Sequence, residues 1–289
     1  MKLTPWESSA VTHSSSSQVL HLLNYLIITP ILGDVISNMN LKSAIEYHKE
    51  KRREDSNAIM TVVFKTICSD SHVRPIHDDL SVAMDAKTNQ ILLFDNSPSQ
   101  DYIRMPQEII NDHPALTFRT DLLDCHIDIC SPEFLLQFSD NFDYLDIRRH
   151  FIQNEVLNWE LGMHIYGLTL TNEYAARVHD PRTYHCISHD IIHRWVYPIV
   201  PDSHLLHSSS TYHSHRFIYR AASSKISRSA KIEDGVVIGE GVTIEDGVLI
   251  SNSVIGRNCT IRSGARISNS HIWEGTAKLK HCFKSVNSL

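Results

Sequence analysis

The segment Cys125-His126-Ile127-Asp128-Ile129-Cys130 brings together thiol, imidazole and carboxylate groups, which are the side chains that bind zinc. A structural zinc site needs four such ligands that converge on one point. These residues instead alternate like a strand, which puts Cys125, Ile127 and Ile129 on one face. The six cysteines of the chain include no C-x-x-C pair, so neither a zinc ribbon nor a redox pair is indicated. We therefore expect reduced, partly buried thiols, no metal and no cofactor.

Composition narrows the class of protein. The 289 residues, 42% hydrophobic and 21% charged, are typical of a globular chain with room for two domains. The formal net charge of −6 offers no basic field for nucleic acid, and the one dense basic stretch, 49–53, is interleaved with Glu50 and Glu54. The apolar run 19–32 is broken by Asn24, Thr29 and Pro30, so we expect a buried strand and no membrane span. Residues 1–18 resemble no signal peptide and are expected to be disordered or an atypical start.

A repeat with a step of six residues, and two slips of five, occupies the C-terminal part of the chain. Its anchors are Ile226, Ile232, Ile238, Ile244, Ile250, Ile255, Ile261, Ile267 and Ile272. Two residues before each anchor stands a small or β-branched residue: Ser224, Ala230, Val236, Val242, Val248, Ser253, Cys259, Ala265 and Ser270. Three residues before four of the anchors stand corner glycines: Gly235, Gly241, Gly247 and Gly264. This period predicts a left-handed parallel β-helix of hexapeptide repeats over 222–284, whereas a helix would repeat near 3.6 and a strand near 2.

Residues 19–200 alternate between strand and helix patterns and predict an α/β domain. Asn40 can cap a helix over 41–53, and Asp180 followed by Pro181 opens a helix to Trp195. Other predicted helices cover 132–138 and 146–161, and the predicted strands are 59–64, 122–130, 163–170 and a hairpin of 80–84 with 91–94. Residues 201–221 are rich in serine and histidine without apolar periodicity, which predicts a flexible linker.

An α/β domain followed by a left-handed β-helix resembles the nucleotide-sugar pyrophosphorylases, and Gly33-Asp34 looks like the pair with which those enzymes hold a metal. The surrounding motifs narrow the resemblance to the epsilon-subunit family of eukaryotic initiation factor 2B, the guanine-nucleotide exchange factor for initiation factor 2, from about residue 31 to 281. The motifs are Val35-Ile36-Ser37-Asn38, Asp121-Leu122-Leu123-Asp124-Cys125-His126-Ile127, Asp140-Asn141-Phe142-Asp143-Tyr144, Tyr174-Ala175-Ala176-Arg177-Val178 and Arg194-Trp195-Val196-Tyr197-Pro198.

This resemblance implies a cytosolic, non-catalytic scaffold and binding segment of a multisubunit complex, with the gamma subunit, other sister subunits and initiation factor 2 as partners. Asn141 and Phe142 match a pair that engages initiation factor 2 in the family. The alternative for the same pair is a helix-ending turn with a buried phenylalanine. The match resembles the middle of the subunit, because the family's first strands, its glycine-rich loop region and its C-terminal helical exchange domain have no counterpart here.

Two enzyme classes compete with this interpretation. A working nucleotidyltransferase needs a glycine-rich phosphate loop, a following basic residue and two metal-binding carboxylates, and only Asp34 is present, so a vestigial site or a turn-capping aspartate is expected. A β-helix acyltransferase needs a histidine within the coils as general base towards an acyl-coenzyme A, and only His271 qualifies.

Overall fold

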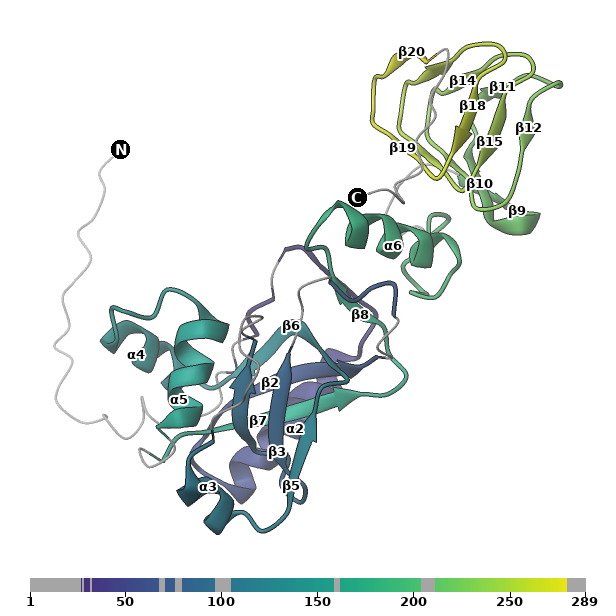
Figure 1. Cartoon of the computed structure of the whole chain (residues 1–289). Coiled ribbons are helices and arrows are strands. Elements are labelled where there is room, and N and C mark those ends of the chain that lie inside the picture. Colours follow the sequence, from purple (N-terminus) through teal and green to yellow (C-terminus); the bar gives the residue numbers. More distant parts are fainter. Residues whose placement is uncertain are drawn as a thin grey trace, which may run out of the picture.

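The computed structural model describes residue 27, residues 29–31, 33–67, 71–75, 80–96, 105–158 and 162–203, and residues 211–279. Figure 1 shows an α/β domain joined to a β-helix, with helix α6 (Pro181–Ile192) between them. The predicted N-terminal segment 1–18 and most of the predicted strand 19–32 lie outside the described residues. Within 19–32, Ile31 forms an isolated antiparallel bridge with Ile127.

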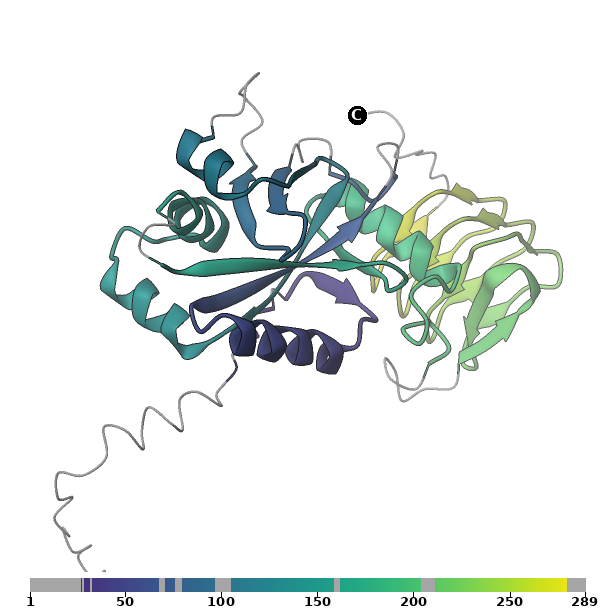
Figure 2. The same cartoon turned by 90° about the horizontal axis from the view of Figure 1, so that it is seen from below.

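A three-stranded sheet forms the centre of the α/β domain, in the order β6 (Leu122–Cys130), β2 (Ala58–Thr66), β7 (His164–Leu170). Strand β2 runs antiparallel to β6 and parallel to β7. Helix α2 (Leu41–Glu54) covers one face of the sheet, as Figure 2 shows, and packs Ala44 against Val63 and Ile129. As predicted, the side chain of Asn40 caps this helix by accepting a hydrogen bond from the backbone N–H of Lys42.

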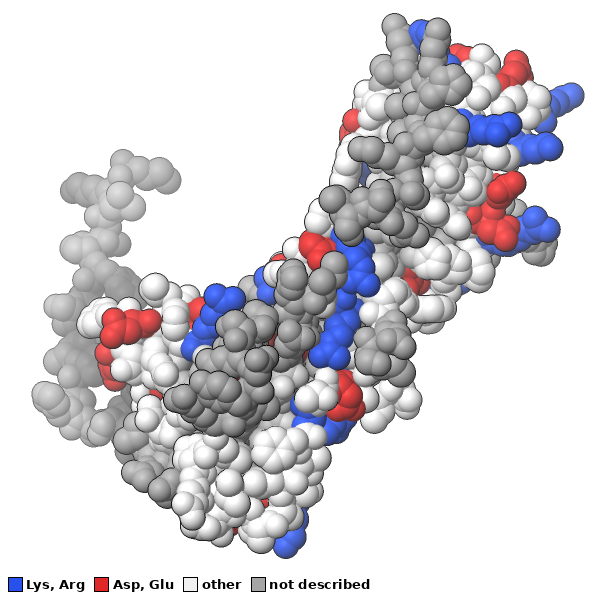
Figure 3. Space-filling view, viewed as in Figure 1, with Lys and Arg blue, Asp and Glu red and all other residues white. Residues whose placement is uncertain are grey.

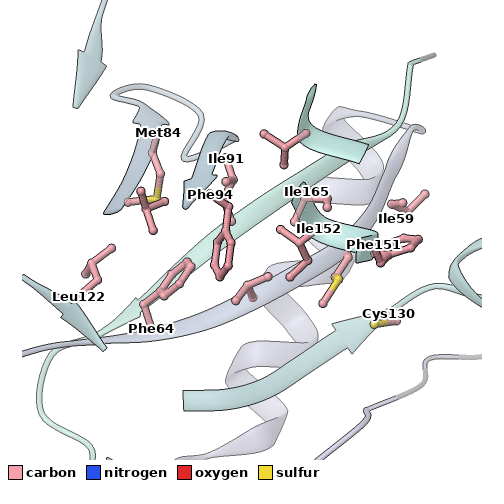
Figure 4. Close-up of a cluster of buried hydrophobic side chains, with 14 of the residues drawn as sticks. Ile59, Phe64, Met84, Ile91, Phe94, Leu122, Cys130, Phe151, Ile152 and Ile165 are labelled. Atoms are coloured by element: carbon pink, nitrogen blue, oxygen red, sulfur yellow. The ribbon is translucent and has the colours of Figure 1, made fainter. Parts of the chain in front are cut away.

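The other face of the sheet carries the larger core. Three helical segments cover it: α4 (Pro132–Asp140), the π-helix η1 (Ile147–Ile152) and α5 (Gln153–Leu157). Figure 4 shows Phe64 and Ile59 from the central sheet meeting Phe94 and Phe151 across this core. A second sheet, ordered β4 (Ile91–Asp95), β3 (Ser81–Asp85), β5 (Leu116–Arg119), contains the predicted hairpin, and a short helix α3 (Gln107–Asp112) precedes β5.

The helix predicted over 146–161 takes a different form. It begins with a π-helical segment, in which the N–H of Phe151 donates to the carbonyl of Asp146, five residues back. The wider turn rotates the residues that follow, so Val156 is buried in the core and Leu157 is 49% exposed. Sequence spacing near 3.6 could not anticipate this shift.

The β-helix follows the predicted repeat. Its short strands are β10 (Ile218–Ala221), β11 (Lys225–Ile226), β12 (Lys231–Ile232), β13 (Val237–Ile238), β14 (Thr243–Ile244), β15 (Leu249–Ser251), β16 (Val254–Ile255), β17 (Thr260–Ile261), β18 (Arg266–Ser268), β19 (His271–Ile272) and β20 (Ala277–Leu279). They stack into three sheets with parallel ladders, in which the isoleucine anchors lie above one another, for example Ile226, Ile244 and Ile261. All four predicted corner glycines have positive φ. Asn252, Asn258 and Asn269 fill the same corner position with φ of 42°, 55° and 46°, as asparagine tolerates this region.

The linker predicted over 201–221 contains ordered structure. Strand β9 (Thr211–Ser214) pairs antiparallel with β10, and β10 pairs in parallel with β13, so the first sheet of the β-helix already begins before residue 222. Apolar periodicity fails to reveal these strands because Tyr219 and Ala221 of β10 stand out of phase with the isoleucine repeat.

Helix α6 packs against both parts of the chain. On one side Ile187 lies in a cluster with Tyr174 and Ala176 of the α/β domain. On the other side the Nδ1 atom of His185 lies 3.0 Å from the Nε2 atom of His271, and the ring of Tyr184 packs on the rings of His271 and Trp273. The predicted flexible link is therefore accompanied by a packed contact between the two parts.

The end of α6 also differs from the prediction. The helix stops at Ile192, because Arg194 adopts a left-handed conformation with φ of 66°. Trp195, which was predicted to end the helix, lies beyond it and is 58% exposed. Its ring packs against that of His72, with ring centroids 5.7 Å apart.

Candidate functional site

The turn between α4 and η1 exposes two large apolar side chains. Phe142 is 93% exposed and Leu145 is 84% exposed. A buried phenylalanine was the structural alternative for the Asn141-Phe142 pair, and this exposure is against it. We call residues 141–146 the docking turn, after the role that the sequence resemblance predicts for Asn141 and Phe142.

Despite its exposure, the docking turn is closely held to the α/β domain. Asn141 is the C-cap of α4, and its side-chain amide donates a hydrogen bond to the carbonyl of Gln137 in that helix. The N–H of Tyr144 in turn donates to the carbonyl of Asn141 at 3.1 Å. Tyr144 points inward, where its ring packs at 5.7 Å and nearly perpendicular to that of Phe151. Its hydroxyl donates to Glu155 at 3.0 Å. Tyr144 therefore anchors the turn between its two outward residues.

The far end of the docking turn is fixed by two side chains. The Nδ1 atom of His150 accepts hydrogen bonds from the backbone N–H groups of Leu145 and Asp146, both at 3.1 Å. The carboxylate of Asp146 accepts from the N–H groups of Arg148 and Arg149, which caps the start of η1. Since an unmet N–H at a helix start costs free energy, these contacts define the path of the chain.

Beneath the docking turn, Arg148 projects into the core and meets two aspartates of β6. Its Nε and Nη2 atoms donate to Asp124 at 2.6 and 2.8 Å, and its Nη1 atom donates to Asp128 at 2.5 Å. Burial raises the pKa of both carboxyl groups, and for Asp124 the arginine outweighs burial and lowers the pKa to about 2. The pKa of Asp128 stays above its ordinary value, because burial and the charge of Asp124 act together. The triad ties η1 to the sheet.

Asp34, the candidate metal ligand, lies just before β1 (Val35–Ser37), which pairs with β8 (Ala175–Arg177). One carboxylate oxygen accepts from the Nε atom of Arg177 at 3.0 Å, and the other is buried without a hydrogen-bond partner among the described residues. A second nitrogen of Arg177 lies 3.2 Å from the Nε2 atom of His126. A fixed guanidinium thus holds the position beside Asp34, and this arrangement does not fit a divalent cation, since the two positive charges would repel.

The remaining sequence candidates lie in packed cores and contacts. Cys125 and Cys130 belong to the cores on opposite faces of β6, and the described residues contain no group of three or more potential metal ligands. Burial, together with the neighbouring His185, lowers the pKa of His271 to about 4. The imidazole lies in the contact with α6, which leaves it poorly placed as a general base. No helix among the described residues has both the length and the apolar character for a membrane span.

An α/β domain followed by a left-handed β-helix of hexapeptide repeats defines the class: a two-part protein with a C-terminal solenoid. Comparison with known sequences shows which proteins the chain is similar to. A family model described as the eIF2B subunit epsilon LbH domain matches residues 215–284. The chain is 45% identical over 196 residues to translation initiation factor eIF2B subunit epsilon of Dictyostelium discoideum, and 38% identical over 200 residues to that of Schizosaccharomyces pombe.

These matches cover 68% and 69% of this chain but only 28% and 29% of the two relatives. Both parts of the chain thus carry the similarity, and the chain spans less than a third of the length of the relatives. The chain is therefore similar to a part of eIF2B subunit epsilon.

Asn141, Phe142 and Asp34 were candidates from the sequence. Leu145 and His150, which lie in or contact the turn after Asn141, were not candidates, and neither was Arg177, which contacts Asp34. Leu145 had a usable signal, because it is an apolar residue in the acidic, turn-forming stretch that also contains Phe142. No local signal marks Arg177, whose contact with Asp34 spans 143 positions along the chain. The role of Asn141 is also clearer, because its amide is engaged in ending α4.

Proposed function

We propose that this chain is a scaffold and docking segment of an exchange-factor epsilon subunit, which assembles with the gamma and other subunits in the cytosol and binds initiation factor 2. In this role it supports GDP/GTP exchange and translation initiation without itself carrying the exchange chemistry. The observation that carries the proposal is Phe142, a 93% exposed phenylalanine on a turn that is otherwise firmly held. Apolar anchors presented on a rigid element are typical of the residues that dominate binding energy at interfaces.

The packing of the two parts supports the scaffold role. Tyr219 of the first coil is fully buried against α6, and its hydroxyl donates to the carbonyl of Ile192 at 2.8 Å. A β-helix fixed to the α/β domain presents partner surfaces on both parts in one defined arrangement, which reduces the entropy lost on assembly.

Exchange itself requires discrimination between nucleotide states of the G protein. A docking surface with equal affinity for the GDP-bound and nucleotide-poor states shifts no equilibrium, however tightly it binds. The contact through Asn141 and Phe142 therefore supplies affinity, and acceleration of GDP release depends on a further element that prefers one state.

The test uses the chain co-expressed with the gamma subunit and purified initiation factor 2 loaded with labelled GDP. We expect co-purification with gamma, binding of initiation factor 2 and little acceleration of GDP release. Phe142→Ala should weaken binding by about 2 kcal/mol, roughly thirtyfold. Phe118→Ala is the matched control, since Phe118 is 57% exposed on β5 in another part of the domain.

Three results would count against the proposal. Failure to co-purify with gamma would remove the assembly role. Equal binding by Phe142→Ala and the parent chain would remove the docking contact. Full acceleration of GDP release would show that the exchange chemistry lies within these residues.

A further inference from the structure

We propose that the docking turn binds through two apolar residues, Phe142 and Leu145, and that His150 positions the second of them. This inference rests on the proposed docking of initiation factor 2. The matching partner surface is an apolar recess bordered by basic side chains.

Leu145 is exposed on the docking turn in the same way as Phe142. It stands three positions further along the same turn and is 84% exposed, and Tyr144 between them is held in the aromatic core. With Tyr144 turned inward, Phe142 and Leu145 both project outward from a fixed backbone. Two apolar side chains on one short, rigid turn make a contact that neither could make alone, and little conformational entropy is lost when they bind.

The charges around the two apolar residues indicate the chemistry of the partner. Asp140, Asp143 and Asp146 are exposed on and beside the docking turn, and Figure 3 shows acidic side chains gathered over α4. Arg149 is the exposed basic residue nearest to them in sequence, and Arg148 is neutralised by its buried aspartates. An acidic rim is complementary in charge to a recess with a basic border. This charge complementarity raises the association rate at low salt.

His150 fixes the backbone at Leu145 through an unusual double contact. One ring nitrogen accepts two adjacent backbone N–H groups, those of Leu145 and Asp146, each at 3.1 Å. Only an unprotonated Nδ1 atom with a free lone pair can accept them. Asparagine places an oxygen at nearly the same position as Nδ1, whereas alanine leaves both N–H groups without this acceptor. Comparison of the asparagine and alanine variants therefore tests whether His150 acts as a hydrogen-bond acceptor or only fills space.

The experiment measures binding of initiation factor 2 to the full chain co-expressed with gamma. Leu145→Ala should weaken binding about tenfold, against the control Ile110→Ala on α3, which is 50% exposed and should stay within about twofold. His150→Ala should match the loss of Leu145→Ala, and His150→Asn should restore most of it. Asp143→Asn should weaken binding at low salt and have little effect at high salt, where the Debye length is short.

Hydrogen exchange at the amides of Leu145 and Asp146 provides a readout that does not involve the partner. Exchange should accelerate at both amides in His150→Ala and return towards the parent rate in His150→Asn, while the amides of β2 remain protected in every variant. The last measurement excludes general unfolding as the cause.

The outcomes separate this inference from the proposed function. If Phe142→Ala weakens binding and Leu145→Ala does not, the two-residue contact is wrong and the docking of initiation factor 2 stands. If Phe142→Ala has no effect, the docking proposal fails, and unchanged amide exchange in His150→Ala would also overturn the positioning role. Equal behaviour of His150→Asn and His150→Ala contradicts the acceptor role of His150.

Discussion

The hydroxyl of Tyr219, in the first coil of the β-helix, donates a 2.8 Å hydrogen bond to the carbonyl of Ile192, the last residue of α6. The final carbonyls of a helix have no partner within the helix, so this bond satisfies a group that would otherwise need water or another donor. Both partners are buried, with Tyr219 fully inaccessible and Ile192 5% exposed. The side chain of Tyr219 in the β-helix thus supplies a donor to the last carbonyl of α6.

Replacement of Tyr219 by phenylalanine should loosen this contact while leaving both parts folded. The buried carbonyl of Ile192 would lose its donor, which costs about 1–3 kcal/mol. Limited proteolysis and hydrogen exchange along α6 would detect the change, with Tyr197→Phe as control, since Tyr197 is 64% exposed. A variant with the exchange rates of the parent along α6 would show that the hydrogen bond contributes little.

Replacement of Phe142 should change stability little, whereas replacement of Tyr144 should lower it strongly. Phe142→Ala removes a side chain that is 93% exposed and should change the free energy of unfolding by less than about 0.5 kcal/mol. Tyr144→Ala removes a ring packed on Phe138 and Phe151, and should cost about 3 kcal/mol. Denaturant unfolding of the two variants tests this contrast, and a large loss in Phe142→Ala would show that its side chain packs in solution.

The core of the β-helix should not accept a charge. Ile244 is 2% exposed and lies between Ile226 and Ile261 in its stack. Ile244→Asp would lose about 1.5–3 kcal/mol of burial and add the cost of a buried carboxylate, so the β-helix should unfold. Thr243→Asp, on the outward position of the same strand, is the control. A melting temperature within a degree or two of the parent would contradict the inward orientation of Ile244.

Acid should destabilise the α/β domain partly through His48. Burial, assisted by the positive charge of Arg52, lowers the pKa of this fully buried histidine to about 4. An unfolded histidine has a pKa near 6.5, so between pH 6.5 and 4 the unfolded state binds more protons and stability falls as pH falls, by up to about 3 kcal/mol. Unfolding measured across this range should show a shallower decline in His48→Gln. The exposed His179, changed to glutamine, serves as control and should leave the decline intact.

The chain should not release pyrophosphate from GTP and a sugar phosphate. Asp34 is bonded to Arg177, whose guanidinium opposes a metal ion at this position. A coupled pyrophosphate assay on the purified chain tests this, with Asp34→Asn alongside. Activity that Asp34→Asn abolishes would restore the nucleotidyltransferase interpretation.

From Lys225 to Ile272 the β-helix was determined by the sequence alone, and its strands stand at the anchors that the repeat predicts. The reason is physical: each coil contacts only the coils above and below it, so burial at an isoleucine such as Ile250 depends on a short, repeated local pattern. The helix caps at Asn40 and Asp180 could also be predicted from the sequence, because a capping side chain bonds to backbone N–H groups only a few residues away.

Only the tertiary structure decided what becomes of the candidate functional residues. Whether Phe142 points into the core or into solvent depends on Tyr144 taking the core position beside Phe151, and a turn of this composition allows either residue to do so. Whether Asp34 is free to bind a metal depends on Arg177, which is distant in sequence and arrives through the pairing of β1 with β8. Contacts between residues far apart in the chain leave no periodic pattern in the sequence. Such contacts determine the exposure of Phe142 and the environment of Asp34.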